Sequence, residues 1–254
     1  MLLERHFIEK PWGWTDLPSA FAAPDGQRVG EVWYETPDAA PLPLLVKWLF
    51  TSEKLSIQVH PSDAEAQARG LPSGKEECWY IVDAEPGAVL GIGTIRPLDS
   101  EELRAASLSG AIEQLIDWKP VKAGDYFYIP AGTVHAIGAG FTLVEVQQYA
   151  DITYRLYDYG RQRALHLDDG VAVSKAAPYV DTRSGQVTGN TQLVDGPHFQ
   201  LWMVADAAGL AAVSSDVVRW VVPVAGNDVG SCRLLGAEEA LSFDAPMLVA
   251  CVTL

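Results

Sequence analysis

Two polar residues with metal-binding atoms interrupt an apolar segment early in the chain. The segment LSIQVH covers residues 55–60. Because side chains on a strand alternate between two faces, Ser56, Gln58 and His60 would share one face and the apolar residues the other. The amide oxygen of Gln58 and the imidazole of His60 could then bind one metal ion. The same alternation also fits the solvent-facing side of a half-exposed sheet, so this segment alone leaves both interpretations open.

A second polar set follows in the segment GKEECWYIV, residues 74–82. If a strand begins at Lys75, then Lys75, Glu77 and Trp79 share one face. A cation, a carboxylate and an aromatic ring form a suitable edge for a ligand pocket, so we expect Lys75 and Trp79 to contact a substrate. The alternative is a surface Lys–Glu pair beside an edge strand. Cys78 would face the opposite side and is not a candidate ligand.

The third segment, GDYFYIPAGTVH over residues 124–135, has the most specific spacing. Glycine, five residues, proline, one residue, glycine, two residues and histidine are the second motif of the cupin family. The motif predicts a strand, a tight turn at the Pro-Ala-Gly sequence and a return strand that begins with His135 facing inward. A histidine so placed in a small barrel is a candidate metal ligand. Ala139 replaces the usual final Asn, so the match covers only the turn and the histidine.

A fourth segment, EVQQYADITYRLYDYGR over residues 145–161, is rich in charge. It supplies Glu145, and then Asp151 and Arg155 four residues apart. These residues can serve a polar pocket. They can also form an ordinary charged strand edge, in which Arg155 pairs with Asp151 or Asp158.

Short runs of apolar or alternating residues between Gly, Pro and Asp predict the strands that must position these side chains. The runs cover residues 44–50, 55–60, 78–82, 126–129, 141–147 and 152–157. Such spacing favours an all-β sandwich or barrel over alternating βαβ units. Helical patterns are short. Asp99 can cap a helical insertion over residues 100–118 that is broken near Gly110, and residues 63–69 predict another short helix.

The C-terminal part of the chain shows strand patterns without a cluster of chemically active residues. Residues 168–190 are expected to form a connection. The runs HFQLWMVAD, DVVRWVVPVAG and PMLVACVTL then predict strands again. We therefore expect a main domain over residues 1–175 and a smaller, structural β domain over residues 176–254 that packs on it.

Composition narrows the class of protein. The 254 residues are 48% hydrophobic and 20% charged, which is ordinary for a globular chain. No apolar run is long enough to span a membrane, the first residues do not resemble a signal peptide, and the three cysteines fit neither a disulfide framework nor a zinc motif. We expect a cytoplasmic location. The net charge of −15 argues against nucleic acid or anionic membrane as a partner. An anionic small substrate would need Lys and Arg residues focused in one cleft.

Taken together, the four segments resemble type I mannose-6-phosphate isomerase in its short bacterial form. Supporting matches lie upstream in KPWGW near Lys10, GEVWY near Glu31 and PLLVKWL near Lys47. The resemblance covers roughly residues 8–170, in order, and implies a cupin or jelly-roll β-barrel. It implies a zinc site formed by Gln58, His60, Glu77 and His135. It also implies that the residues serving a phosphosugar are Lys75 and Arg155, with Glu145 and Asp151 nearby.

The donor types agree with this implication. Oxygen and nitrogen ligands without a thiolate suit zinc and are also compatible with iron, manganese, cobalt and nickel. The implied reaction interconverts mannose 6-phosphate and fructose 6-phosphate through a cis-enediol, with the metal as Lewis acid. A histidine, a carboxylate such as Glu145 or Asp151, or a water on the metal could each be the base. Arg155 and Lys75 would stabilise negative charge on oxygen.

Three other functions share some of these features. A non-catalytic sugar-phosphate sensor would keep the fold, although it has no need for both a metal site and a pair of cations. A redox cupin such as a dioxygenase usually has a His-x-His pair with a Glu a few residues later. Here QVH stands in its place, and Glu77 lies 17 residues beyond His60. An isomerase for another phosphosugar is the third alternative, because the chain is shorter than is usual for the resembling family.

Overall fold

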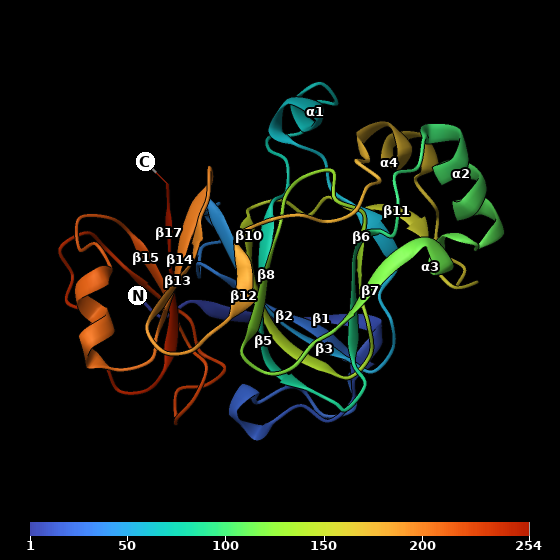
Figure 1. Ribbon diagram of the computed structural model, residues 1–254. Coiled ribbons are helices and arrows are strands. Elements are labelled where there is room, and N and C mark those ends of the chain that lie inside the picture. Colours follow the sequence, from blue (N-terminus) through green and yellow to red (C-terminus); the bar gives the residue numbers. More distant parts are fainter. Residues whose placement is uncertain (254) are drawn as a thin grey trace.

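Three antiparallel β-sheets form the framework of the structure (Figure 1). The computed structural model describes residues 1–253. The first sheet contains, in spatial order, β1 (Glu4–Trp14), β2 (Val29–Glu35), β3 (Leu44–Thr51), β10 (Phe141–Gln148), β5 (Glu77–Ala84), β8 (Asp125–Ile129) and β12 (Ser184–Gln186). The second contains β11 (Tyr154–Tyr157), β4 (Ile57–Val59), β9 (His135–Ile137), β6 (Val89–Thr94) and β7 (Ile116–Pro120). The third contains β13 (Thr191–Asp195), β14 (Phe199–Val204), β17 (Met247–Val252), β15 (Arg219–Pro223) and β16 (Arg233–Leu235).

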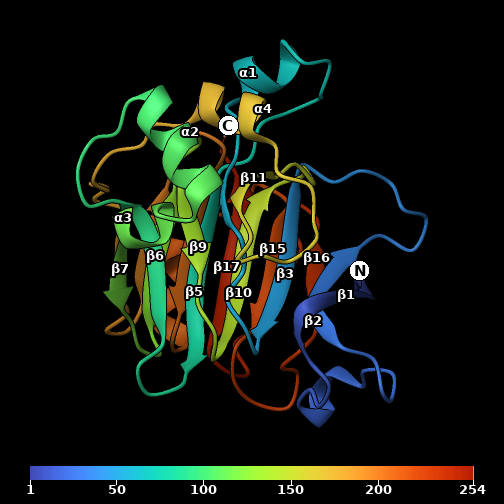
Figure 2. The ribbon, with the colours of Figure 1, turned by 90° about the vertical axis from the view of Figure 1, so that its right-hand side faces the viewer.

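The helices are short and gather near one end of the sheets (Figure 2). They are α1 (Asp63–Gln67), α2 (Ser100–Ser109), α3 (Ile112–Leu115) and α4 (Leu167–Val173), and the chain also has two short 3-10 helices, η1 (Ser19–Phe21) and η2 (Ala207–Ala212). Asp99 caps α2 by accepting the backbone N–H of Glu102, and α2 ends at Gly110, as predicted. Within residues 1–253, no helix combines the length and apolar character that crossing a membrane requires.

The first and second sheets face each other and enclose an apolar core. Its members include Leu49, Trp79 and Leu143 from the first sheet and Leu90, Ile92 and Ile137 from the second. Two facing antiparallel sheets of this kind form the predicted all-β barrel, so the fold-class prediction is confirmed. The polar segments singled out in the sequence lie on strands of both sheets, and their side chains meet in the space between them.

The other faces of these two sheets are also covered. The first sheet packs on the third through Val46, Trp48 and Val146 on one side and Leu201, Trp220 and Leu248 on the other. The second sheet is covered by the helices, through Leu103 of α2, Ile112 of α3 and Val171 of α4. All eight residues of β3 are therefore buried. Val46, Trp48 and Phe50 face the third sheet, while Lys47 and Leu49 face the barrel interior.

The segment predicted as a connection contains more structure than expected. α4 occupies its first residues, and β12 adds an edge strand to the first sheet next to β8. The helix forms because Val171 and Val173 bury against the second sheet, a tertiary contact that the sequence DDGVAV does not reveal locally. The third sheet begins at Thr191. We propose a division of the chain near residue 175, with residues 176–254 as the smaller unit and β12 as the strand that this unit adds to the edge of the first sheet.

Candidate functional site

Three metal-ligating side chains converge between the first and second sheets. His60 lies directly after β4, Glu77 begins β5 and His135 begins β9. One ligand atom from each lies within 4.8 Å of the others, and all three residues are buried. Glu77 comes from the first sheet and the histidines from the second, so this cluster joins the two halves of the barrel.

The histidines direct the same ring nitrogen into the cluster. His60 Nδ1 lies 2.7 Å from the carbonyl oxygen of Ile152, and His135 Nδ1 lies 2.9 Å from that of Thr133. Because a carbonyl oxygen can only accept, each Nδ1 carries the proton and each Nε2 keeps its lone pair. His60 Nε2 and His135 Nε2 lie 3.6 and 3.5 Å from the two carboxylate oxygens of Glu77.

Burial keeps both imidazoles neutral. It lowers the pKa of His60 well below its ordinary value, and the nearby Lys75 charge lowers it further. Burial also lowers the pKa of His135, to about 4. The neutral imidazole with a free Nε2 is the form that binds a metal ion, and a carbonyl on the opposite nitrogen is the usual way to orient such a ligand.

Gln58 completes the set predicted from the sequence. It pairs with His135 across β4 and β9, and its Nε2 lies 3.3 Å from His135 Nε2. Its Oε1 accepts the hydroxyl of Ser56 at 3.1 Å. A half-turn of the amide exchanges its oxygen and nitrogen, so Gln58 can present an oxygen to the point that the histidines face.

The four residues fit a divalent metal. His60 Nε2 and Glu77 Oε1 are buried and accept no hydrogen bond within the described chain. Leaving such atoms without a partner costs about 1–3 kcal/mol each, and more for a charged group, so a cation at their meeting point would stabilise both. The donors are nitrogen and oxygen, as zinc accepts. Cys78 faces the other side of β5, in the core next to the third sheet, as expected.

Two glycines bring the ligand segments together. Gly132 has φ +85°, and its N–H donates to the carbonyl of His60 at 2.9 Å. A Cβ there would lie 3.0 Å from the carbonyl oxygen of Val173. Gly74 lies so close to residues 61–63 that a Cβ would come within 2.4 Å of a backbone carbon. The close approach lets the N–H of Lys75 donate to the carbonyl of Pro61 at 3.0 Å.

A polar pocket adjoins the ligand cluster. Gln58 and Lys75 line it, and they also contact His135 and Glu77 behind them. Its charged lining residues are the cations Lys10, Lys47, Lys75, Arg155 and Arg163 and the carboxylates Glu31, Glu145 and Asp151. Positive charge therefore exceeds negative charge at this pocket, although the whole chain carries −15. This is the focusing of Lys and Arg that an anionic substrate requires.

Glu145 holds two of the lysines in place. Its Oε1 lies 3.2 Å from Lys47 Nζ and 3.6 Å from Lys75 Nζ, and its Oε2 accepts the indole N–H of Trp79 at 3.0 Å. The β-sheet register produces this arrangement, because Lys47 and Trp79 are the two cross-strand partners of Glu145. Burial raises the pKa of Glu145, but Lys75 and Lys47 lower it by more, to about 2. The carboxylate is therefore ionised.

The remaining predicted residues occupy different positions around the pocket. Trp79 is fully buried behind Glu145, with its ring 5.4 Å from that of His135, and it is not among the described lining residues. Lys75 lies before β5 begins, yet its Nζ lies 2.7 Å from Glu77 Oε2. Asp151 and Arg155 both line the pocket. Within the described residues, Arg155 forms no ion pair with Asp151 or Asp158, which was the alternative interpretation of that segment.

The sequence analysis assigned no role to four of the charged residues that line the pocket. Lys10, Glu31 and Lys47 were noted only as parts of matching motifs, and they form a chain of ion pairs: Glu31 lies 3.1 Å from Lys10 and 3.8 Å from Lys47. The signal for Lys47 was present, since it is the single charge in the eight-residue strand LLVKWLFT. Arg163 carried no recognisable signal, because it lies in a loop beyond β11.

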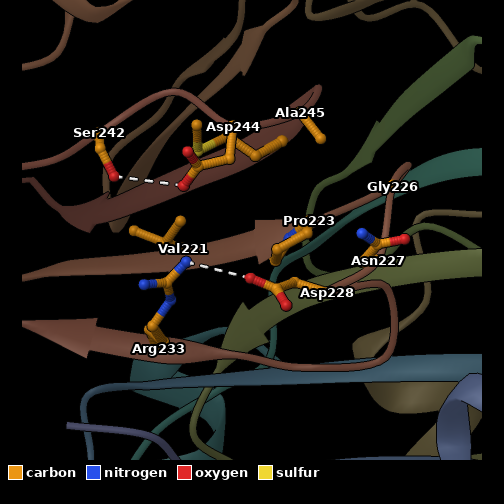
Figure 3. Close-up of a pocket in the computed structure, with 10 residues that line it drawn as sticks. Val221, Pro223, Gly226, Asn227, Asp228, Arg233, Ser242, Asp244 and Ala245 are labelled. Atoms are coloured by element: carbon orange, nitrogen blue, oxygen red, sulfur yellow. Dashed lines mark hydrogen bonds and ion pairs between the residues drawn. The ribbon is translucent and has the colours of Figure 1, made fainter.

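A second pocket lies in the C-terminal part, next to the ends of β15 and β17 (Figure 3). Its volume is about 260 Å³. Its charged residues are partly paired with each other, since Arg233 lies 3.5 Å from Asp228 and Ser242 donates to Asp244 at 3.3 Å. None of the described residues that line it is a histidine or a cysteine. The candidate metal ligands and the pocket with excess positive charge therefore both lie in the barrel.

The known proteins whose sequences are similar to this chain share one name, mannose-6-phosphate isomerase. A mannose-6-phosphate isomerase of Streptococcus mutans is 41% identical over 172 residues, which are 63% of this chain and 54% of that protein. The probable mannose-6-phosphate isomerase GmuF of Bacillus subtilis is 30% identical over 279 residues, 91% of this chain and 88% of that protein. This chain thus spans about half of the first relative and most of the second. No protein-family model matches the chain.

Solved structures agree on the fold. The mannose 6-phosphate isomerase of Bacillus subtilis aligns with a TM-score of 0.75 and 25% identity, over 99% of this chain and 96% of that one. A zinc-bound mannose 6-phosphate isomerase aligns with a TM-score of 0.69 and 14% identity, over 100% and 99% of the two chains. The cupin-type barrel inferred from the GDYFYIPAGTVH motif is confirmed.

Proposed function

The chain belongs to the mannose-6-phosphate isomerase family, and on that premise we propose that it interconverts mannose 6-phosphate and fructose 6-phosphate through a cis-enediol. One observation carries the proposal. A buried set of metal-ligating atoms adjoins a pocket in which cations outnumber carboxylates. The first feature suits the chemistry at the sugar carbonyl, and the second suits a phosphorylated substrate. We also propose a cytoplasmic location, since phosphosugars are metabolites of the cell interior.

The metal in this proposal is zinc. Gln58, His60, Glu77 and His135 would hold it, and when bound it supplies a Lewis-acid charge near the oxygens of the substrate. The hydrogen bonds that would orient the metal ligands are already in place, because the carbonyl oxygens of Ile152 and Thr133 hold the two imidazoles. Such contacts raise the basicity of the ligand and fix its direction.

The lysines and Glu145 form the electrostatic part of the site. Lys75 lies between Glu77 and Glu145, and both carboxylates raise its pKa against the effect of burial, so it stays protonated. A fixed ammonium can donate to a substrate oxygen as negative charge develops there. Glu145 has a pKa of about 2 and is therefore a weak base. We assign it the role of holding Lys47 and Lys75.

Of the three carboxylates that line the pocket, Glu31 and Glu145 are paired with lysines, so Asp151 remains for proton transfer. It lines the pocket and has no ion-pair or hydrogen-bond partner among the described residues. In the proposed reaction its carboxylate accepts the proton from C2 as the C1–C2 double bond forms, and the same proton returns at C1. A second proton passes from the C2 hydroxyl to O1, so that the C1 carbonyl becomes a hydroxyl and the C2 hydroxyl becomes the carbonyl. Arg155, which also lines the pocket, supplies a permanent positive charge for the anionic substrate.

The test is an assay of the purified protein on mannose 6-phosphate, before and after removal of metal with a chelator. We expect fructose 6-phosphate to form, the rate to fall on chelation and zinc to restore it. Oxygen consumption is measured alongside to detect redox chemistry. A folded, metal-loaded protein that turns over neither mannose 6-phosphate nor oxygen would overturn the proposal in favour of a sensor or of another phosphosugar.

A further inference from the structure

Three arginines gather around one buried carboxylate at the edge of the pocket. Asp158 follows β11, and only 2% of its side chain is exposed. Arg163 donates to it from two nitrogens, Nε to Oδ2 at 2.7 Å and Nη2 to Oδ1 at 2.6 Å. Arg161 Nη2 lies 2.9 Å from the same Oδ1. The single negative charge of Asp158 thus neutralises only one of the two positive charges of Arg161 and Arg163.

Arg155, the third arginine, has no carboxylate partner within ion-pair distance in the described chain. Its Nη1 donates to the carbonyl of Ala164 at 2.9 Å, and its Nε is buried without a hydrogen-bond acceptor. Burial lowers the pKa of Arg155, and the neighbouring charge of Arg163 lowers it further. A buried donor without an acceptor, beside a second cation, indicates that an anion from outside the chain belongs here.

Arg155 and Arg163 line the same pocket as Gln58 and Lys75, whereas Arg161 does not. Arg161 instead lies 3.7 Å from Glu53 and donates to the carbonyl of Lys54 at 2.7 Å. The cluster therefore has two arginines that face the pocket and one that faces the surface behind it.

The contact between Asp158 and Arg163 leaves part of the guanidinium free. The carboxylate uses the Nε–H and one Nη2–H, so three of the five N–H groups of Arg163 remain available. Because Asp158 already fixes the Arg163 side chain, binding of a ligand to the free edge of the guanidinium costs little further rotamer entropy. Phosphate oxygens match that edge in geometry and in charge.

We propose that Arg163 joins Arg155, already assigned to the anionic substrate, in binding the phosphate group of the phosphosugar, and that Asp158 is the positioning residue that fixes Arg163 for this contact. The inference rests on the proposed function for the identity of the substrate, but not for the presence of an anion site. Asp158 touches no substrate itself. It keeps Arg163 pointed into the pocket through the two hydrogen bonds that it accepts from that guanidinium.

The experiment compares Arg163→Ala with the matched control Arg161→Ala in the zinc-loaded enzyme. Both variants remove one positive charge and one contact to Asp158. We expect Arg163→Ala to raise the KM for mannose 6-phosphate, and the inhibition constant of inorganic phosphate, by about ten- to a hundredfold, with a smaller change in kcat. Arg161→Ala is expected to change either constant by less than about threefold. Arg163→Lys should fall between them, because an ammonium cannot keep both contacts.

Asp158 is tested by Asp158→Asn, which keeps the shape and removes the charge. A positioning role predicts weaker inhibition by inorganic phosphate and an unchanged zinc content. A merely structural role would lower the melting temperature and leave the phosphate inhibition constant unaltered. If this variant does not fold, the comparison of Arg163→Ala and Arg163→Lys with Arg161→Ala tests the proposal without it.

Two outcomes separate this inference from the proposed function. An active enzyme in which Arg163→Ala leaves both constants unchanged would overturn the inference and leave the isomerase activity standing. A wild-type protein without isomerase activity that binds inorganic phosphate in calorimetry, and loses this binding in Arg163→Ala but not in Arg161→Ala, would support the anion site and overturn the proposed function.

Discussion

At the scale of single residues, the site depends on buried polar atoms whose partners are only partly supplied by the chain. His60 and His135 each use Nδ1 for a carbonyl and turn Nε2 toward Glu77. His135 Nε2 also lies 3.3 Å from the amide nitrogen of Gln58, whereas His60 Nε2 is buried without a hydrogen-bond partner in the described chain. A core histidine with a purely structural role would be expected to have both nitrogens partnered. The free nitrogen of His60 therefore argues for a ligand at this point more strongly than the residue type does.

Replacement of His60 by alanine tests this argument. We expect His60→Ala to bind less than about a tenth of the zinc of the wild type and to lose activity by about a thousandfold or more, because a three-ligand remainder holds zinc weakly. Metal content and turnover are measured on the same sample, and circular dichroism checks that the barrel still folds. His6→Ala, on the exposed side of β1, is the control. Full turnover in a zinc-free variant would contradict the metal site.

Glu145 is expected to matter for both stability and rate. Glu145→Gln keeps the size of the side chain and an acceptor for Trp79 but leaves Lys47 and Lys75 without this carboxylate. Removing one partner from a buried ionic network costs about 3–5 kcal/mol. We predict a loss of that order in the free energy of unfolding, and a fall in kcat of about a hundredfold as the lysines lose their positions.

The pH dependence of this loss follows from the pKa of Glu145. That pKa is about 2, below the ordinary 4.5. The carboxylate therefore contributes its full stabilisation above pH 4.5 and loses it as the pH falls from 4.5 toward 2. The difference in unfolding free energy between wild type and Glu145→Gln should therefore shrink as the pH falls from 4.5 toward 2. Near neutral pH this difference also varies, because burial and the charge of Glu145 raise the pKa of Glu77 to about 7. A difference that stays constant below pH 4.5 would show that Glu145 is not held ionised by Lys75 and Lys47.

At the scale of strands and turns, alternation predicted which side chains share a face. Ser56, Gln58 and His60 do lie on one side of the segment around β4, although β4 itself covers only three residues. The motif ending in His135 gave the turn and the return strand correctly. Both predictions succeed because strand periodicity and turn chemistry are local properties.

Local sequence patterns did not identify the residues that reach the pocket only through the pairing of distant strands. Lys47 and Glu145 lie almost a hundred positions apart and become neighbours only because β3 pairs with β10. Arg163 reaches the pocket through a loop that is held by Asp158. α4 was missed for the same reason, since its helical state depends on burial against the second sheet.

Gly132 provides a test of how a turn supports the metal site. An alanine there must adopt φ +85° and place its Cβ 3.0 Å from the carbonyl oxygen of Val173. Gly124 is a matched control, because it has φ +87° and open space around a Cβ. Both substitutions should destabilise the protein by about 1–2 kcal/mol through backbone strain. Only Gly132→Ala should also weaken zinc binding, by about tenfold, because it disturbs the hydrogen bond to the carbonyl of His60.

Zinc affinity is measured by competition with a chromogenic chelator, and stability by denaturant unfolding. Equal zinc affinity in the two glycine variants would show that the turn supports the fold alone.

At the scale of the whole molecule, the candidate site lies between the first and second sheets, and the third sheet forms a separate layer. The third sheet packs on the outside of the first, on the face opposite to the one that carries Lys47, Glu77 and Glu145 (Figure 1). It contributes apolar side chains to the shared core but none of the described residues that line the pocket. The sequence suggested this role, because the C-terminal runs were apolar and lacked a polar cluster.

A cavity between the first and third sheets should therefore affect stability without affecting chemistry. Leu248 of β17 is fully buried in that core. Leu248→Ala is expected to lower the free energy of unfolding by about 2–5 kcal/mol and to leave kcat, KM and zinc content unchanged at a temperature where the protein stays folded. Leu108→Ala removes the same atoms from a side chain that is 66% exposed on α2, and it should change stability by less than about 0.5 kcal/mol. If Leu248→Ala instead alters KM or zinc content in the folded state, the third sheet shapes the site through the strands it supports, and its role extends beyond stability.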